Sequence, residues 1–189
     1  MRFRIDSRHL NDVVILATNI FEDERGFFTE SFRADYFAAL GLPTEYPQDS
    51  HTRSRIGVIR GMHFQHFPPM GKVTRVICGS AYFVAVDIRK DSPTFGKWAG
   101  VEISEENRKQ MWIPPGFAFG YCVLSDFTQV LYKCTSIYDP KAEGIIRYDD
   151  PALGIDWPTK NKWIVSQKDQ NAPTLTEWLA APQSASLRT

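Results

Sequence analysis

The segment Arg60-Gly-Met-His63-Phe-Gln65 places a cation, a glycine and an imidazole inside an otherwise apolar run. Histidine titrates near neutrality, so His63 is a candidate general base in a pocket. The competing interpretation is a hydrogen-bonded core histidine beside an arginine with a buried stem, and for this segment alone that interpretation is the more common one. Strict alternation along a strand puts Arg60 and His63 on opposite faces. Both can line one cavity only if the strand is bulged, and Gly61 is where such a bulge would sit.

Three further polar side chains are candidates for the same pocket. Lys72 opens an apolar run, Tyr132 interrupts another, and Asp169 follows the last clear strand. Taken singly, they are a surface lysine, a half-buried tyrosine and a loop aspartate. With His63 they supply a base, a carboxylate partner, a cation for a developing oxyanion and a phenolic proton donor. That combination suits proton abstraction next to a carbonyl group.

A metal site is the alternative use of histidine. His63 and His66 form the only close pair in the sequence. Residues three apart on a strand point to opposite faces, so this pair would make a poor chelate. His9 and His51 lie in polar sequence that resembles loops. We therefore predict that the protein binds no metal ion.

Short strands must position these side chains, because runs rich in Val, Ile, Phe and Tyr alternate with turn residues along most of the chain. The predicted strands are Val13–Ala17, Phe27–Phe32, Val58–Gln65, Lys72–Cys78, Ala81–Ile88, Trp98–Ile103, Lys109–Ile113, Gly120–Leu124 and Thr128–Thr135. The runs on either side of Gly79-Ser80 look like a hairpin. Helix is predicted for Ala34–Leu40, which stops at Gly41, and for Thr174–Ala180. Many strands and little helix indicate an antiparallel sandwich or barrel.

The run from Lys72 to Cys78 has no purely apolar face, since Lys72 and Thr74 lie on one side and Arg75 on the other. A small barrel with a polar ligand cavity would produce this pattern, because both its lumen and its packed exterior need occupants. One solvated sheet face would explain it equally well.

Composition fits one domain spanning residues 1–189, with a tail from about residue 183 that we expect to be frayed. Lys plus Arg and Asp plus Glu number 22 each, so the net charge is zero and gives no reason to expect nucleic acid or an anionic membrane as partner. The polar N-terminus does not fit a signal peptide, and no apolar stretch is long enough to span a bilayer. We expect a soluble cytoplasmic protein whose three cysteines are buried and reduced: Cys78, Cys122 and Cys134.

Several ordered motifs between Val13 and Pro173 resemble the dTDP-4-dehydrorhamnose 3,5-epimerases, a family of cupin-type enzymes. The motifs are Phe21-Glu-Asp-Glu-Arg-Gly-Phe-Phe-Thr-Glu30, Gln48-Asp-Ser-His-Thr-Arg-Ser54, Arg60-Gly-Met-His-Phe-Gln65, Gly71-Lys-Val-Thr-Arg75, Val84-Ala-Val-Asp-Ile-Arg89, Ser92-Pro-Thr-Phe-Gly96, Trp112-Ile-Pro-Pro-Gly-Phe-Ala118, Tyr132-Lys-Cys-Thr135 and Ile155-Asp-Trp-Pro158. The resemblance implies an all-β, cupin-type jelly-roll barrel with short peripheral helices, assembled as a homodimer. It also implies epimerisation at C3, C5 or both of a nucleotide-diphosphate 4-keto-6-deoxy sugar in rhamnose or deoxysugar biosynthesis.

The resemblance assigns roles to the candidate residues. His63 would be the base, oriented by Asp169, with Tyr132 as the acid on the opposite face of the sugar and Lys72 beside the enolate oxygen. Arg60 would contact the diphosphate or the sugar. The remaining expected substrate contacts are Gln48, Ser50, Phe119 and Tyr138 in the site, and Phe21, Arg25 and Glu30 on the nucleotide, reaching across the dimer interface. A 4-ketone acidifies the C–H bonds at C3 and C5, so this chemistry needs neither metal nor cofactor.

Two positions depart from the family pattern. Phe119 stands where the family usually has histidine, and Ser50 stands where it usually has asparagine. Phenylalanine cannot form the hydrogen bond that histidine can, so one ligand contact is lost or replaced.

Three alternatives to a 3,5-epimerase remain open. Phe119 favours the first, a single-centre epimerase acting on a related dTDP-, CDP- or GDP-linked keto-sugar. The second is a 3,4-ketoisomerase on a similar barrel, which the pairing of His63 with Tyr132 argues against. The third is a non-catalytic sugar-nucleotide binding module, which would predict loss of the base or the acid, and both are present.

Overall fold

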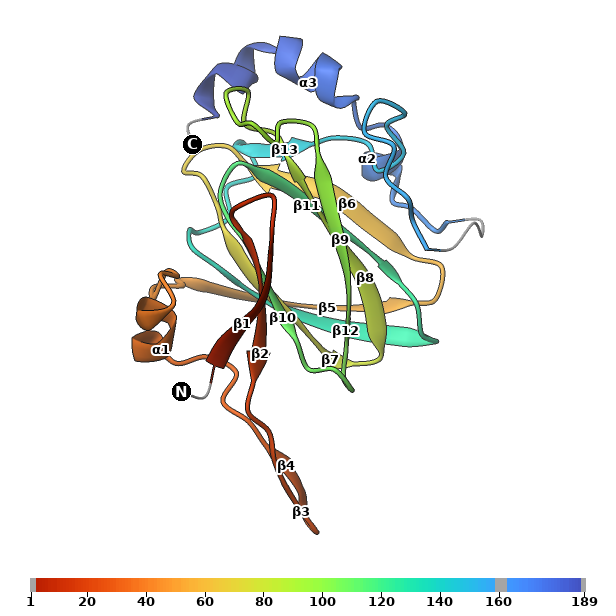
Figure 1. Ribbon diagram of the computed structural model, residues 1–189. Coiled ribbons are helices and arrows are strands. Elements are labelled where there is room, and N and C mark those ends of the chain that lie inside the picture. The colour runs from red at the N-terminus through yellow and green to blue at the C-terminus, as the bar shows by residue number, and fades with distance from the viewer. Residues whose placement is uncertain (1–2, 159–162, 188–189) are drawn as a thin grey trace.

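Two antiparallel sheets form the body of the protein in the computed structural model, which describes residues 3–158 and 163–187 (Figure 1). The first sheet has the order β1 (Phe3–His9), β2 (Val13–Thr18), β10 (Gln110–Ile113), β7 (Lys72–Cys78), β12 (Phe127–Cys134) and β5 (Gln48–Arg55). The second has the order β13 (Glu143–Ile145), β6 (Ile59–Gln65), β11 (Phe117–Val123), β8 (Ser80–Asp87) and β9 (Trp98–Ser104). The predicted all-β jelly-roll architecture is confirmed.

Apolar side chains from the inner faces of both sheets meet in one core. The six-stranded sheet contributes Ile15 and Met111, among others, and the five-stranded sheet contributes Phe83 and Phe117; all four are at most 2% exposed. Alternation along each strand sends these side chains inward and their neighbours outward. The core closes one part of the space between the sheets and leaves the other part to polar side chains.

The outer faces of the sheets are covered by separate segments. Helix α1 (Ala34–Ala39) buries Phe37 against Val14 and Trp112 on the six-stranded sheet. Helices α2 (Gln167–Gln170) and α3 (Leu175–Ala180) follow the strands, and Trp178 of α3 packs edge-on against Phe64 of the five-stranded sheet. None of the helices in the described part of the chain has the length and apolar character needed to cross a membrane.

The C-terminal tail forms two short helical segments in the structure. Thr174 and Glu177 form a capping box at the start of α3, and a 3₁₀ helix, η1, covers Pro182–Ser186. The Ser186 hydroxyl lies 2.6 Å from His66 Nδ1. The frayed tail expected from about residue 183 includes this 3₁₀ helix in the structure, and residues 188 and 189 lie outside the described part.

A two-stranded hairpin, β3 (Phe21–Asp23) with β4 (Gly26–Phe28), extends away from the body (Figure 1). The strand predicted for Phe27–Phe32 ends at Phe28. Arg108, between β9 and β10, links the hairpin to the body. It forms a 2.7 Å ion pair with Glu22, and its guanidinium lies 4.1 Å from the centre of the Phe27 ring.

The hairpin predicted around Gly79-Ser80 is wrong, because β7 and β8 belong to different sheets. Gly79 has a φ of +78°, and a Cβ there would lie 2.2 Å from the carbonyl oxygen of Phe127. This glycine lets the chain turn from one sheet into the other at a crowded corner. Strands β1 and β5 were not predicted, and they contain His9 and His51, which the sequence placed in loops.

Candidate active site

A cavity of about 610 Å³ lies between the two sheets, and most of the predicted site residues line it. From the six-stranded sheet come Gln48, Ser50, Lys72 and Tyr132; from the five-stranded sheet come Arg60, His63 and Phe119. Tyr138 and Asp169 line it from outside these strands. Nine of the twelve predicted residues therefore share one cavity, which has a polar wall on each sheet.

The predicted bulge in β6 is present and brings Arg60 and His63 to the same cavity. His63 pairs with Phe119 and Arg60 pairs with Tyr121, so two residues of β6 oppose the single residue Gly120. Gly61 has a φ of +122°. A Cβ at this position would lie 2.6 Å from the Cα of Gly120, so only glycine fits here.

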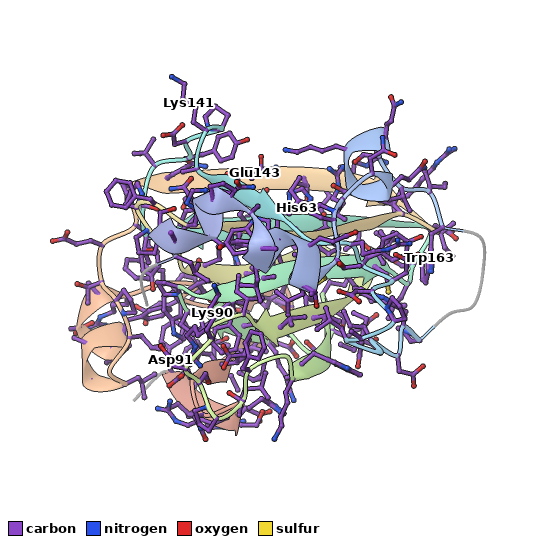
Figure 2. The ribbon with its side chains drawn as sticks, turned by 90° about the horizontal axis from the view of Figure 1, so that it is seen from above. His63, Lys90, Asp91, Lys141, Glu143 and Trp163 are labelled. Carbon is purple, nitrogen blue, oxygen red and sulfur yellow. The ribbon has the colours of Figure 1, made fainter. Side chains whose placement is uncertain are left out.

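Both ring nitrogens of His63 contact carboxylates. Nε2 lies 2.9 Å from Asp169 Oδ1, as the sequence predicted, and Nδ1 lies 2.8 Å from Glu143 Oε1 (Figure 2 labels His63 and Glu143). Burial lowers the pKa of His63, but the hydrogen bonds to Asp169 and Glu143 outweigh it and leave the pKa above its ordinary value. In this arrangement the imidazolium donates to both carboxylates.

Asp169 is fixed by its local backbone. The Ser166 side chain caps α2 by accepting a hydrogen bond from the Asp169 N–H, which sets the direction of the aspartate. Its second oxygen accepts a 3.3 Å hydrogen bond from the Gly61 N–H, and the residue is 4% exposed. Burial raises the pKa of Asp169, yet the His63 contact and these other hydrogen bonds leave it below its ordinary value, so the carboxylate is ionised.

Glu143 and Lys168 line the cavity but were not among the predicted site residues. Glu143 lies in the three-residue strand β13, whose sequence carries no motif. Its Oε2 accepts hydrogen bonds from the Tyr138 hydroxyl at 2.7 Å and from Lys168 Nζ at 2.5 Å. Burial opposes ionisation, but the His63, Lys168 and Tyr138 contacts lower the pKa of Glu143 to about 2. Glu143 is thus a second ionised carboxylate beside the histidine.

The opposite wall supplies a phenol and an ammonium group. Tyr132 and Lys72 come from adjacent strands of the six-stranded sheet and face the cavity. Burial raises the pKa of Tyr132, which keeps the phenol protonated, and burial lowers the pKa of Lys72. A pocket with a base on one sheet and a proton donor and a cation on the other can act on two faces of a flat substrate.

Phe119 forms the apolar floor of this pocket. The residue is 6% exposed, and its ring stacks on Phe83 with 5.7 Å between centroids. Lys72 Nζ lies 5.7 Å from the centre of the Phe119 ring. The face of an aromatic ring attracts a cation, so Phe119 offers Lys72 a contact without a hydrogen bond.

Three predicted residues do not line the cavity in this chain. Phe21 and Arg25 lie on the projecting hairpin, and Glu30 follows it. Phe21 is 48% exposed, and Arg25 is paired with Asp23 at the tip. Because these residues lie outside the cavity of their own chain, they would have to contact a substrate held in the cavity of another subunit.

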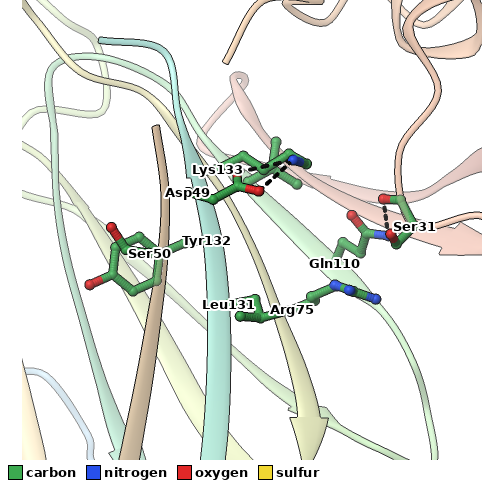
Figure 3. Close-up of a pocket in the computed structure, with 9 residues that line it drawn as sticks. Ser31, Asp49, Ser50, Arg75, Gln110, Leu131, Tyr132 and Lys133 are labelled. Carbon is green, nitrogen blue, oxygen red and sulfur yellow. Dashed lines mark hydrogen bonds and ion pairs between the residues drawn. The ribbon is translucent and has the colours of Figure 1, made fainter. Parts of the chain in front are cut away.

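A smaller cavity of about 150 Å³ lies on the outer side of the six-stranded sheet (Figure 3). Lys133 and Asp49 form an ion pair there, and Gln110 donates a hydrogen bond to the Ser31 carbonyl. Burial lowers the pKa of Arg75 in the same cavity. Lys133 and Gln110 thus have partners within this cavity, and Arg75 is a partly buried cation beside them.

The described residues contain no group of three or more His, Cys, Asp or Glu side chains that could hold a metal ion. His66 does not line the cavity with His63; its ring lies near Trp178 and Ser186. The cysteines are free; Cys122 and Cys134 are buried as predicted, whereas Cys78 is partly exposed.

Comparisons with known proteins agree with this geometry. A sequence model of the family described as dTDP-4-dehydrorhamnose 3,5-epimerase matches residues 7–177. The enzyme of that name from Methanothermobacter thermautotrophicus is 45% identical over 93% of this chain and 96% of its own length. The one from Neisseria gonorrhoeae is 46% identical over 93% of this chain, which spans only 53% of that relative.

Solved structures give the same result. The 3,5-epimerase of Legionella pneumophila, determined in complex with dTDP-4-keto-L-rhamnose, superposes with a TM-score of 0.92 at 43% identity and covers 98% of this chain and 97% of its own. A more distant relative, 37% identical over 82% of this chain and 75% of its own, is the dTDP-4-dehydrorhamnose 3-epimerase of Streptomyces niveus. The extent of the match to both sequence and fold shows that this chain belongs to the dTDP-4-dehydrorhamnose 3,5-epimerase family.

Proposed function

We propose that the protein epimerises C3 and C5 of a dTDP-linked 4-keto-6-deoxyhexose by removing and returning protons next to the ketone. The observation that carries this proposal is the placement of His63 on one sheet and of Tyr132 and Lys72 on the other, around one cavity. A ketone at C4 acidifies both neighbouring C–H bonds, so the reaction needs a base, an acid and a positive charge at the oxygen.

Each step uses a group already in the cavity. His63 takes the proton from carbon, and Asp169 holds the imidazole in place through Nε2. Lys72 stabilises the enolate oxygen. Tyr132, a protonated phenol on the other wall, delivers a proton to the opposite face of the carbon and so inverts it. Over one inversion His63 gains one proton and Tyr132 loses one, so the step balances. Proton exchange with solvent through the cavity then returns both side chains to their starting states.

Substrate binding divides between the cavity and the hairpin. Arg60, Gln48 and Tyr138 line the cavity, where Gln48 accepts a hydrogen bond from the Tyr138 backbone N–H and so fixes the edge of the site. We place the nucleotide against Phe21, Arg25 and Glu30 of a second subunit in a homodimer. The exposed aromatic residues of the hairpin, Phe21, Phe27 and Phe28, support an interface there, since a two-stranded hairpin has little stability of its own in water.

The decisive experiment is incubation with dTDP-4-keto-6-deoxyglucose in D₂O, with NMR detection of the hydrogens at C3 and C5. We expect deuterium to enter both positions and the L-configured product to form. Absence of exchange at either carbon would refute the proposal, and bound but unchanged substrate would indicate a non-catalytic binding module.

A single-centre epimerase is the second candidate, because Phe119 removes a hydrogen-bonding group from the pocket and the family includes a 3-epimerase in Streptomyces niveus. The same NMR experiment separates the two candidates. Deuterium at only one of the two carbons, after many turnovers, would select the single-centre reaction.

A further inference from the structure

The contact of His63 with two carboxylates conflicts with its use as a base. An imidazole ring has two nitrogens, and here each lies within 2.9 Å of a carboxylate oxygen. A carboxylate can only accept, so both contacts are hydrogen bonds only when both nitrogens carry protons. The imidazolium has no lone pair with which to take a proton from carbon. The arrangement therefore stabilises the inactive protonation state of the base.

We propose that Glu143 is a releasable counter-ion that masks His63 in the free enzyme and moves away when the sugar enters, which frees Nδ1 to act as the base. Glu143 is a positioning residue in this proposal, since it acts through His63. The proposal deepens the proposed function and depends on it only for the step in which the sugar takes part.

Glu143 is the carboxylate better suited to leave. If it breaks its bond to Nδ1, its Oε2 still accepts from Tyr138 and Lys168. The partners of Glu143 Oε2 are exposed side chains that can move with it, whereas Asp169 Oδ2 accepts from the buried backbone N–H of Gly61, which would lose its partner if Asp169 moved away. An unsatisfied buried donor is costly, so the histidine keeps Asp169 and gives up Glu143.

The proton balance of the cycle is simple. The imidazolium first loses its Nδ1 proton to water in the open cavity, while Nε2–H continues to donate to Asp169. The neutral ring then takes the proton from carbon onto Nδ1, and the electron pair of the broken C–H bond becomes the enolate. The imidazolium that results returns that proton to solvent before the next turnover.

The remaining charged and titratable groups of the cavity either favour or disfavour the protonated imidazole of His63. Three phenols line the cavity, those of Tyr121, Tyr132 and Tyr138, together with the thiol of Cys134. The pKa values of Tyr132, Tyr138 and Cys134 are raised, so these groups are neutral near pH 7. The cations Arg60, Lys72 and Lys168 disfavour a charged imidazole. Among the described residues that line the cavity, only Asp169 and Glu143 favour the imidazolium, so the charge of Glu143 should control the protonation state of His63 in the free enzyme.

The test measures the pKa of the His63 ring by imidazole ¹⁵N NMR in the free protein, with the other three histidines as internal references. Glu143→Gln keeps the shape and a hydrogen-bond acceptor but removes the charge, and it should lower the His63 pKa by about 1–3 units. Lys168→Gln should raise the His63 pKa, because it removes a positive charge that disfavours the imidazolium and that also binds Glu143 through Oε2. The exposed Glu105→Gln is the charge-matched control and should leave it unchanged.

A role in packing alone would not move the pKa in opposite directions in the two variants. The acid limb of kcat/KM against pH, which reports free-enzyme groups, should move with the NMR value. At alkaline pH, Glu143→Gln should retain far more activity than a variant without the base.

A His63 pKa that stays within about 0.3 units of wild type in both variants overturns the proposal. The titration needs no substrate, so a failed epimerase assay with shifted pKa values would refute only the proposed function.

Discussion

Asp169 and Glu143, which contact both ring nitrogens of His63, favour its protonated form, and the proposed role of His63 as the base can be tested directly. We expect His63→Asn to abolish deuterium exchange at the sugar, with a loss of at least about 10²–10⁴-fold, since the variant keeps the size of the side chain but removes the titrating group. Binding of dTDP, measured by calorimetry, should stay close to wild type, because the nucleotide is held elsewhere. Activity within a few-fold of wild type would exclude His63 as the base.

Tyr132 lies on the opposite wall from His63 and should govern inversion rather than deprotonation. His63 alone can remove a proton and return a deuteron on the same face, whereas inversion needs the phenol. In Tyr132→Phe, deuterium wash-in measured by NMR should therefore survive better than formation of the inverted product. Equal loss of both would instead make Tyr132 a binding or structural residue.

We expect Phe119 to influence how the sugar is held between two proton transfers. Inversion at both C3 and C5 requires the ring to change its pose while the nucleotide stays anchored, and the buried Phe119 ring offers no hydrogen bond to either pose. We expect one carbon, C5, to exchange faster than the other in the wild-type protein. Phe119→His should bring the two exchange rates closer, and equal rates in wild type that the substitution leaves unchanged would remove this residue from the explanation.

Strand β6 delivers two functional side chains to one cavity through its bulge at Gly61. Gly61→Ala should destabilise the protein by about 1–3 kcal/mol or more, because the new Cβ would meet the backbone of Gly120 at a positive φ. It should also reduce kcat strongly by displacing His63. Gly96→Ala is the control: its φ of +72° carries the same kind of strain, but no atom lies within 4 Å of the new Cβ. Thermal unfolding should separate the two, and similar losses of Tm would show that crowding at Gly61 has no effect.

Strands with an apolar face could be predicted from the sequence, whereas a fully polar strand and a turn between the sheets could not. Strands with an apolar face, such as β8 and β9, were predicted to within a residue of their bounds because alternation marks them. Strand β5 was missed because one of its faces lines the cavity and the other faces outward, so Gln48–Arg55 contains no apolar residue at all. The corner at Gly79 was read as a hairpin because a local glycine signal cannot tell which sheet the next strand joins.

Some residues of the candidate site could be predicted from the sequence and others could not. The residues in ordered motifs, including His63, Lys72 and Tyr132, were found from the sequence, and all three line one cavity. Glu143 was not found, because its strand has three residues and its contact with His63 joins positions 80 residues apart. Only the pairing of β13 with β6, which sets Ile145 opposite His63, brings this carboxylate to the base.

At the scale of the whole molecule, the hairpin β3–β4 projects away from the two sheets (Figure 1), and none of its residues lines the cavity between them. A polar tip with Arg25 and an aromatic stem would fit a substrate-binding arm that serves a neighbouring subunit. If the arm serves a neighbouring subunit as proposed, the active unit is a dimer in which each cavity combines the base of one subunit with the arm of the other. Light scattering should give the mass of two chains.

Mixing two defective subunits tests the exchange of arms directly. Arg25→Ala should raise KM, because it removes the cation from the arm, and His63→Asn should remove the base; each homodimer is then impaired in both cavities. After denaturation and joint refolding, a heterodimer has one cavity with an intact His63 from one subunit and an intact Arg25 from the other. Random pairing of equal amounts should make about a quarter of all cavities complete, and wild-type KM should reappear in that fraction. If instead each arm served its own cavity, no combination would restore an intact site, and the mixture would only average the activities of the two parents.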